Sequence, residues 1–420
     1  MPGLAKLALL SAWNRRYSLG LTMLAIALAV TLLLGIERIR HEVRDGFAQS
    51  VSGTDLIVGA RSSPLQLVLY SVFRLGEATH NMSWPSAQRI AAHPAVAWTI
   101  PISLGDSHRG YPVVGTTPDY FVHFQHGDRQ SLRLASGRPF GDLFETVIGA
   151  EVAAQLGYVQ GDAITLSHGL GGTRLMEHAG KPFTVVGVLA RTGTPVDRSV
   201  HINLASMEAI HLDWVGGAPL PGLEISADQV TRFDLEPKNI TALLVGLESR
   251  AAVFRIQREI NRDEEEALMA VLPGVALAQL WQLVGVAEQA LLLISALVVV
   301  VSLVGLVAAM LTGLDQRRRE LAILRSSGAR PRDVFALLAL EGGLVTLSGV
   351  LLGLVLLTAL LVFGAPLVES RLGLGLELVA PGLRELRLLG LVLLVSMLTC
   401  LLPGWRAYRI SLADGLTPRV

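Results

Sequence analysis

The ten histidines are the side chains of this 420-residue chain best suited to metal chemistry. All of them lie between His41 and His211, and His123 and His126 are three residues apart in His-Phe-Gln-His. Two imidazoles at this spacing can lie on one helical face or in one loop and bind zinc or copper together. No third ligand is obvious in the sequence, and surface histidines that only form hydrogen bonds are the alternative. We therefore expect no metal site, and His123 and His126 are the candidate ligands if there is one.

Motifs for nucleotide hydrolysis and nucleophilic catalysis do not occur in the sequence. The motif G-x-x-x-x-G-K-[ST] is missing, and the glycine-rich segment at residues 169–174 lacks both its lysine and a preceding strand. The motifs H-E-x-x-H and G-x-S-x-G are missing too, and Cys400, the only cysteine, lies in an apolar run. The sequence therefore predicts a protein that is not an enzyme and that holds no cofactor of its own.

One carboxylate, Glu341, falls about ten residues into a helix that continues as an apolar run. Charged side chains inside a membrane span are usually functional, so Glu341 is a candidate proton-relay group. It is also well placed near the cytoplasmic surface of the membrane, paired with an arginine of the short loop that precedes it. We favour this second interpretation.

Four apolar runs must position these side chains. They are residues 17–36 and about residues 288–314, 336–368 and 386–404. Each can cross a bilayer, since about 20 apolar residues at 1.5 Å rise span its hydrocarbon core. Basic residues cluster in residues 1–16, between the second and third runs, and after the fourth. By the positive-inside rule these clusters face the cytoplasm, which places both termini there and residues 37–285 outside it. No small-residue cleavage site follows the first run, so we expect a retained anchor.

Composition and patterning agree with a membrane protein that carries an exported domain. Hydrophobic residues make up 51% of the chain and charged residues 17%, which is too apolar for a typical soluble protein. The formal net charge is zero, so nothing suggests a nucleic-acid partner. Short segments rich in β-branched residues predict strands at residues 55–59, 183–189, 199–203 and 240–245. We expect an integral membrane α-helical protein with four transmembrane helices and a large mixed α+β extracytoplasmic domain.

Helical patterns complete the exported part. Residues 146–157 predict a strand followed by a short helix that Gly157 ends. Residues 251–272 predict one amphipathic helix that Pro273-Gly274 ends. Apolar residues also recur at helical spacing in residues 36–47 and 277–284, next to the first two spans. These two segments can pair as a stalk, or they can be unrelated surface helices.

The sequence predicts a short arginine-rich helix at residues 315–328, between the second and third spans. Apolar residues such as Leu324 lie on one side of it, as in a helix that lies along a membrane surface. Gly328 can end this helix, Pro331 can open the next one, and Asp333 suits its first turn. The result would be a rigid helix–turn–helix on the cytoplasmic side, whereas a basic loop that only sets topology is the alternative.

Several segments resemble a known family. Residues 317–329, Arg-Arg-Arg-Glu-Leu-Ala-Ile-Leu-Arg-Ser-Ser-Gly-Ala, are similar to the R-R-R-E-I-x-I-L-R-A-x-G-A signature of the FtsX-like permease domain. Residues 403–416 resemble its closing P-A-x-R-A-x-R-x-x-P-x-E-A-L, with Leu412 and Asp414 in place of the usual proline and glutamate. The segments that resemble the MacB-type periplasmic core domain are residues 147–157, 161–166 and 183–189. Together the resemblance covers nearly the whole chain.

The resemblance implies the permease subunit of a MacB-like (type VII) ABC transporter. Residues 37–285 would be the MacB-like core domain with its helical stalk, and residues 286–420 the FtsX-like permease domain. A separate ATPase subunit would bind ATP and magnesium, and a second permease chain, identical or homologous, would complete the dimer. The helix at residues 315–328 would dock on the ATPase. The residues implied for this coupling are Arg317, Arg318, Arg319, Glu320, Leu324, Arg325 and Gly328.

The implied function is mechanotransmission. ATP-driven closure in the cytoplasm would be relayed to the exported domain, which would export or move a peptide, a lipid or lipoprotein, or a small molecule. The implied location is the bacterial inner membrane, in contact with its lipid and with a periplasmic or lipoprotein partner. A signalling scaffold that activates an exported enzyme without moving cargo is the alternative. Metal handling, suggested by the histidines, is a third hypothesis.

Overall fold

The computed structural model describes most of the chain and divides it into two units. The described residues are 16–50, 52–76, 78–169, 177–178, 180–215, 218–220, 225–316, 326, 330–372 and 381–409. The helical unit comprises Met1–Glu42 and Gly285–Val420, and the α/β unit comprises Val43–Val284.

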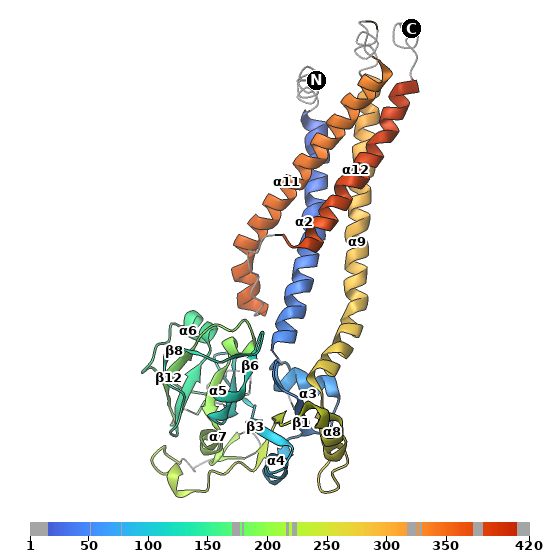
Figure 1. The fold of residues 1–420 in the computed structure, drawn as a ribbon. Helices are drawn as coiled ribbons and strands as arrows, with labels where there is room; N and C mark the ends of the chain where they lie inside the picture. The colour runs from blue at the N-terminus through green and yellow to red at the C-terminus, as the bar shows by residue number, and fades with distance from the viewer. Residues whose placement is uncertain are drawn as a thin grey trace. The chain divides into compact units, whose positions relative to one another are not determined.

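Long helices make up the described part of the helical unit (Figure 1). They are α2 (Arg16–Gln49), α9 (Pro273–Gln316), α11 (Pro331–Leu372) and α12 (Leu383–Arg409). Each contains a stretch long and apolar enough to cross a membrane, and these stretches are Arg16–Glu42, Pro273–Leu314, Arg332–Gly364 and Leu383–Pro403. Large apolar side chains such as Leu21, Leu293 and Phe363 are exposed on the helices, as expected of residues that face lipid. The predicted fold class is confirmed.

Small residues let α11 pack closely against α2. A Cβ built on Gly349 would lie 2.9 Å from the Ile26 side chain, and one built on Gly353 would lie 2.8 Å from the Ala27 carbonyl oxygen. The Thr31 hydroxyl donates a hydrogen bond to the Gly353 carbonyl at 3.0 Å. Two glycines four residues apart are the pattern by which membrane helices approach each other's backbones.

Similar contacts join α11 to α12. A Cβ on Gly342 would overlap the Cys400 Sγ, so the helices approach closely at this level. The hydroxyls of Thr346 and Ser396 hydrogen-bond between the two helices. Cys400 is buried, as expected of a small packing residue.

The described strands of the α/β unit form two main sheets. The first is antiparallel and has the order β18 (Leu268–Val271), β1 (Leu56–Ala60), β17 (Ala242–Leu247), β3 (Val96–Ile102). The second has the order β10 (Ala163–Ile164), β12 (Phe183–Leu189), β9 (Glu145–Ile148), β13 (Val200–Asn203), β5 (Tyr111–Thr116), β4 (Asp106–His108), β11 (Ser167–His168), with β8 (Leu134–Gly137) also paired to β12. The pairs β9–β12 and β5–β13 are parallel, and the others are antiparallel.

Short helices and small ladders complete this unit. The helices are α3 (Pro64–Ser71), α4 (Trp84–Ala91), α5 (Asp119–His123), α6 (Ala150–Leu156), α7 (Leu204–His211) and α8 (Val253–Asn261). The two-stranded ladders are β2 (Met82–Ser83) with β16 (Asn239–Ile240), β6 (Gln125–His126) with β7 (Gln130–Ser131), and β14 (Trp214–Val215) with β15 (Ala218–Pro219). One buried apolar cluster joins the two sheets through Ile57 and Leu244 of the first and Val114 and Val147 of the second.

Several local predictions are confirmed. Residues 183–189 form β12, and Gly157 ends α6 in the left-handed conformation with a φ of 73°. Pro331 opens α11, and the Asp333 side chain accepts a hydrogen bond from the Arg330 backbone N–H at 2.8 Å. These features depend on local chemistry that a few neighbouring residues determine.

The amphipathic helix predicted for residues 251–272 is wrong in its second half. The helix α8 ends at Asn261, and β18 follows as an edge strand paired with β1. Asp263 turns the chain by accepting hydrogen bonds from two backbone N–H groups that follow it, each at 2.9 Å. Pro273 does not end a helix but opens α9, because a proline at the first position of a helix loses no intrahelical hydrogen bond.

Candidate functional site

The second sheet of the α/β unit brings four ligand-type side chains together. In the antiparallel pair β4–β11, Asp106 lies directly opposite His168. His211 is the last residue of α7, which packs against β5 and β13. His178 is held by a backbone hydrogen bond from its N–H to the Leu166 carbonyl at 2.9 Å.

Three imidazoles surround one carboxylate oxygen of Asp106. The distances from Asp106 Oδ1 are 3.1 Å to His168 Nδ1, 3.4 Å to His211 Nε2 and 3.6 Å to His178 Nε2. His168 Nδ1 and His211 Nε2 are 3.1 Å apart, and the four donor atoms all lie within 4.8 Å of one another. Within the described residues, this is the only group of three or more His, Cys, Asp or Glu side chains close enough to share a metal ion. We call it the Asp106 cluster.

The electrostatics of the Asp106 cluster depend on burial and on the shared carboxylate. Burial would raise the pKa of Asp106, but the three histidines hold that pKa well below its usual range, so the group is ionised at neutral pH. Burial lowers the pKa of His178 in spite of the nearby carboxylate. For His211, burial is outweighed by Asp106, and the pKa is raised. The cluster therefore combines an anionic oxygen with at least one neutral imidazole.

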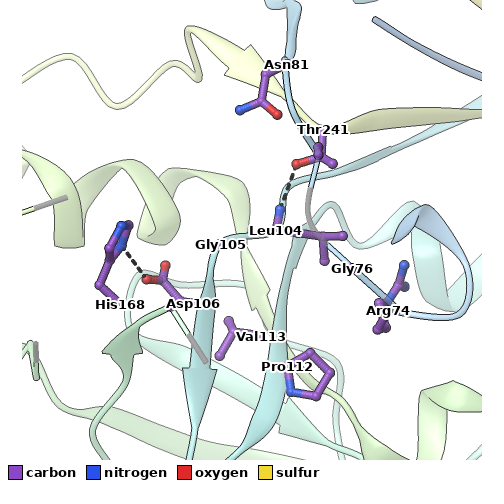
Figure 2. A pocket seen from close by; sticks show the side chains of 12 residues that line it. Arg74, Gly76, Asn81, Leu104, Gly105, Asp106, Pro112, Val113, His168 and Thr241 are labelled. Atoms are coloured by element: carbon purple, nitrogen blue, oxygen red, sulfur yellow. Dashed lines mark hydrogen bonds and ion pairs between the residues drawn. The ribbon is translucent and has the colours of Figure 1, made fainter. Parts of the chain in front are cut away.

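A cavity of about 240 Å³ borders the Asp106 cluster. Asp106 and His168 lie on one side of it and Arg74 on the other (Figure 2). The side chains of His168 and His211 are 31% and 27% exposed, whereas Asp106 is fully buried. A small cation can therefore reach the cluster from solvent.

The two histidines predicted from their spacing lie elsewhere in the α/β unit. His123 ends α5, and its ring stacks on Trp98 with the ring centroids 5.3 Å apart. His126 lies in β6 and pairs with β7. Neither belongs to the Asp106 cluster. Sequence reasoning missed the cluster because its members are far apart in the chain, and the only signal was that the histidines all fall in this region.

An ionic cluster joins three helices of the helical unit. Its members are Glu37, Arg38, Arg40, Glu288, Arg384 and Glu385. Arg38 of α2 pairs with Glu385 of α12 at 3.0 Å, and both side chains are largely buried. Arg40 of α2 lies 3.8 Å from Glu288 of α9. Glu37 is buried and pairs with two of the arginines.

The predicted intramembrane carboxylate, Glu341, is buried in the helical unit. It lies in α11 next to Gly342, the residue that packs against Cys400 of α12. Of the loop arginines with which it was expected to pair, Arg317, Arg318, Arg319 and Arg325 lie outside the described residues. The interfacial pairing and the proton-relay function both stay predictions.

Two family models match consecutive parts of the chain. The model of the MacB-like periplasmic core domain matches residues 19–262, more than half of the sequence. The model of the FtsX-like permease C-terminal domain matches residues 292–412. The chain belongs to the MacB/FtsX-like family of ABC transporter permeases. It is thus a membrane protein with an extracytoplasmic domain, and its family implies an ABC ATPase as partner.

The permease is also similar to two solved structures. The periplasmic region of MacB from Actinobacillus actinomycetemcomitans is 10% identical, with a TM-score of 0.34, and the match covers 56% of this chain and 97% of that one. The extracellular domain of the noncanonic ABC-type transporter YknZ from Gram-positive bacteria is 12% identical, with a TM-score of 0.31, and the match covers 52% and 99%. No curated protein matches the permease.

The residues that the family resemblance implies for ATPase coupling cannot be placed in the permease structure. They are Arg317, Arg318, Arg319, Glu320, Leu324, Arg325 and Gly328, and all of them lie outside the described residues. Their assignment therefore stays a prediction from the sequence.

Proposed function

We propose that this permease couples ATP hydrolysis by a separate ATPase subunit to the movement or export of a substrate at the α/β unit. The substrate classes that fit are a peptide, a lipid or lipoprotein, and a small molecule. The observation that best supports the proposal is the order of the two family matches. The MacB-like match, residues 19–262, begins within the first span, and the FtsX-like match, residues 292–412, begins within the second span and contains the third and fourth.

In the proposed arrangement, the chain lies in the bacterial inner membrane with both termini in the cytoplasm and the α/β unit in the periplasm. The ATPase subunit binds ATP and magnesium, and this chain supplies no catalytic group. A second permease chain, identical or homologous, completes the transporter, and a periplasmic or lipoprotein partner receives or presents the substrate. The arginine-rich segment from Arg317 to Gly328 docks on the ATPase.

Two unbroken helices support a mechanical function. The helix α2 continues to Gln49, beyond the limit of the helical unit at Glu42, and α9 begins at Pro273, before that unit resumes at Gly285. The Arg44 guanidinium lies over the Trp281 ring, 5.3 Å from its centroid, which is a contact expected of a paired stalk. Because a continuous helix carries an unbroken ladder of backbone hydrogen bonds, it can transmit a displacement along its axis.

The test is association with the candidate ATPase. The full-length chain would be purified with that ATPase in nanodiscs, and ATP turnover measured with and without alanine at Arg317, Arg318 and Arg319. We expect the alanines to weaken association about tenfold or more, because a charged docking helix would lose its ion pairs. ATP turnover by the ATPase alone should not change.

A matched control separates docking from a general loss of charge. Arg255, Arg258 and Arg262 are three exposed arginines of the α/β unit, and alanine at these positions should leave association intact. Association that survives the change at Arg317–Arg319 would contradict the coupling assignment. Failure to bind any ATPase would favour the signalling scaffold that activates an exported enzyme.

A further inference from the structure

We propose that the α/β unit binds one divalent cation of the zinc class through Asp106 Oδ1, His168 Nδ1, His178 Nε2 and His211 Nε2. This inference does not depend on the proposed transport function. It rests on the geometry of the Asp106 cluster, on buried polar atoms there that lack hydrogen-bond partners within the described part of the chain, and on the groups that orient the imidazoles.

Four of the six distances between donor atoms of the Asp106 cluster are close to the edges of a tetrahedral zinc site, and all six are within 4.8 Å. Zinc bonds of about 2.0–2.1 Å to nitrogen or oxygen place tetrahedral ligand atoms about 3.3 Å apart. From Asp106 Oδ1 to the three ring nitrogens the distances are 3.1, 3.4 and 3.6 Å. The edge from His168 to His211 is 3.1 Å. Only small movements of the side chains are needed to surround an ion.

Hydrogen bonds alone leave the Asp106 cluster unsatisfied. The His178 side chain is 1% exposed, yet neither of its ring nitrogens has a hydrogen-bond partner among the described residues. Asp106 Oδ2 is also buried, and no described residue forms a hydrogen bond with it. Such groups are rare because burying an unpaired polar atom costs free energy. A cation bound among the four side chains would satisfy His178 through its Nε2 and balance the buried charge of Asp106.

Neighbouring groups orient the imidazoles as they do around known metal ions. His211 Nδ1 lies 2.8 Å from the Met207 carbonyl oxygen, to which it can only donate, so in the neutral ring Nε2 carries the lone pair that can bind a cation. The Trp214 ring packs against His178 and His168, with centroid distances of 4.4 and 5.4 Å. An apolar wall of this kind limits water at a metal site.

The ligand set selects the class of metal. Three imidazoles and one carboxylate suit zinc and the neighbouring divalent transition metals, whereas calcium and magnesium prefer sites made of oxygen atoms. Copper(I) prefers sulfur ligands, and the cluster has none. A bound ion would cross-link β4, β11 and the end of α7 with His178.

The test is metal binding by the full-length permease, purified in detergent without a polyhistidine tag and stripped with a chelator. Zinc chloride should bind with one tight equivalent per chain and a dissociation constant below micromolar, and excess magnesium should not compete. Cobalt chloride should give the intense visible absorption of a four-coordinate ion. His178→Ala and His211→Ala should each weaken zinc binding about 100-fold.

The control is the double variant His123→Ala, His126→Ala, which removes two histidines of the same unit outside the cluster and should bind zinc like the wild type. No zinc binding tighter than micromolar in the wild-type protein would overturn the proposal. So would binding that persists in His178→Ala and His211→Ala, or a weak six-coordinate cobalt spectrum. If the alanine variants fail to fold, the stoichiometry and cobalt spectrum of the wild type decide the question.

Discussion

His201 of β13 shows how burial fixes the charge state of a single side chain. It is fully buried, and its ring lies near Tyr120, with the centroids 5.1 Å apart. Its Nδ1 lies 3.2 Å from the Val147 carbonyl oxygen and donates to it. Burial, helped by the charge of Arg74, lowers the pKa of His201 to about 3, although the bond to Val147 opposes the shift. The folded protein therefore keeps this histidine neutral.

We predict that His201 makes the α/β unit less stable in mild acid. Between about pH 6.5, the ordinary pKa of histidine, and about pH 3, the unfolded chain binds a proton at His201 that the folded protein does not bind. The free energy of unfolding therefore decreases as the pH is lowered through this range. The slope reaches about 1.4 kcal/mol per pH unit, which gives a loss of about 2 kcal/mol near pH 5. This loss of stability is measured by following tryptophan fluorescence during thermal unfolding at several pH values from 7 to 5.

The comparison variant is His201→Phe, which keeps an aromatic ring beside Tyr120 but cannot titrate. As the pH is lowered, its melting temperature should fall less than that of the wild type. Each kcal/mol of unfolding free energy that the wild type loses through His201 corresponds to a difference of about 2–4 °C. His80→Ala, at an exposed position, should keep the wild-type slope. An equal slope in His201→Phe would show that this histidine is not the source.

At the residue scale, the sequence indicated the region of the Asp106 cluster but not its members. The confinement of all ten histidines to one stretch was visible, but the i, i+3 spacing pointed to His123 and His126. The cluster instead depends on long-range pairing, because β4 meets β11 only when the second sheet forms. Asp106 itself gave no signal, since a single aspartate in a short strand has no distinctive pattern.

At the scale of elements, local signals predicted well and tertiary pairing did not. Gly157 and Pro331 mark helix ends through their own backbone preferences, and the structure has both ends there. The apolar residues of the second half of segment 251–272 recur at spacings that fit a helix. They form β18 instead, because the edge of β1 offers backbone partners that the sequence pattern does not reveal.

The contact between α2 and α11 leads to a prediction for Gly353. The change Gly353→Val puts side-chain atoms where even a Cβ lies 2.8 Å from backbone, and overpacking of this kind costs about 1–3 kcal/mol. We expect a lower melting temperature in detergent. The control is Gly343→Val on the same helix, since a Cβ there has nothing within 4 Å. Equal melting temperatures for the two variants would mean that α2 and α11 do not depend on this close approach.

At the scale of the whole molecule, the four spans and the exported domain were readable from the sequence, whereas the contacts that tie the spans together were not. For residues 36–47 the sequence predicted only a helix with apolar residues at helical spacing. Three charged residues of that segment, Glu37, Arg38 and Arg40, pair with residues of α9 and α12. This ionic cluster joins the helices at the level where α2 and α9 leave the helical unit. A displacement of α12 can therefore reach the two helices that continue into the α/β unit.

We predict that the pair Arg38–Glu385 is needed for this transmission. Glu385→Arg places two cations side by side in a largely buried position, which should separate α2 from α12. In the complex with the ATPase, hydrogen exchange of the α/β unit should then lose its difference between ATP and ADP, while ATP turnover continues. The double swap Arg38→Glu, Glu385→Arg should restore most of that difference, because it reverses the pair without removing it.

Reversing the exposed pair Arg89–Glu265, which lies within the α/β unit at 2.6 Å, controls for a general effect of charge and should change nothing, since exposed ion pairs contribute little. Two results would contradict transmission through the cluster. One is an ATP-dependent difference that survives Glu385→Arg. The other is a double swap that behaves like the single variant, because the position would then matter only for packing and not for the ion pair.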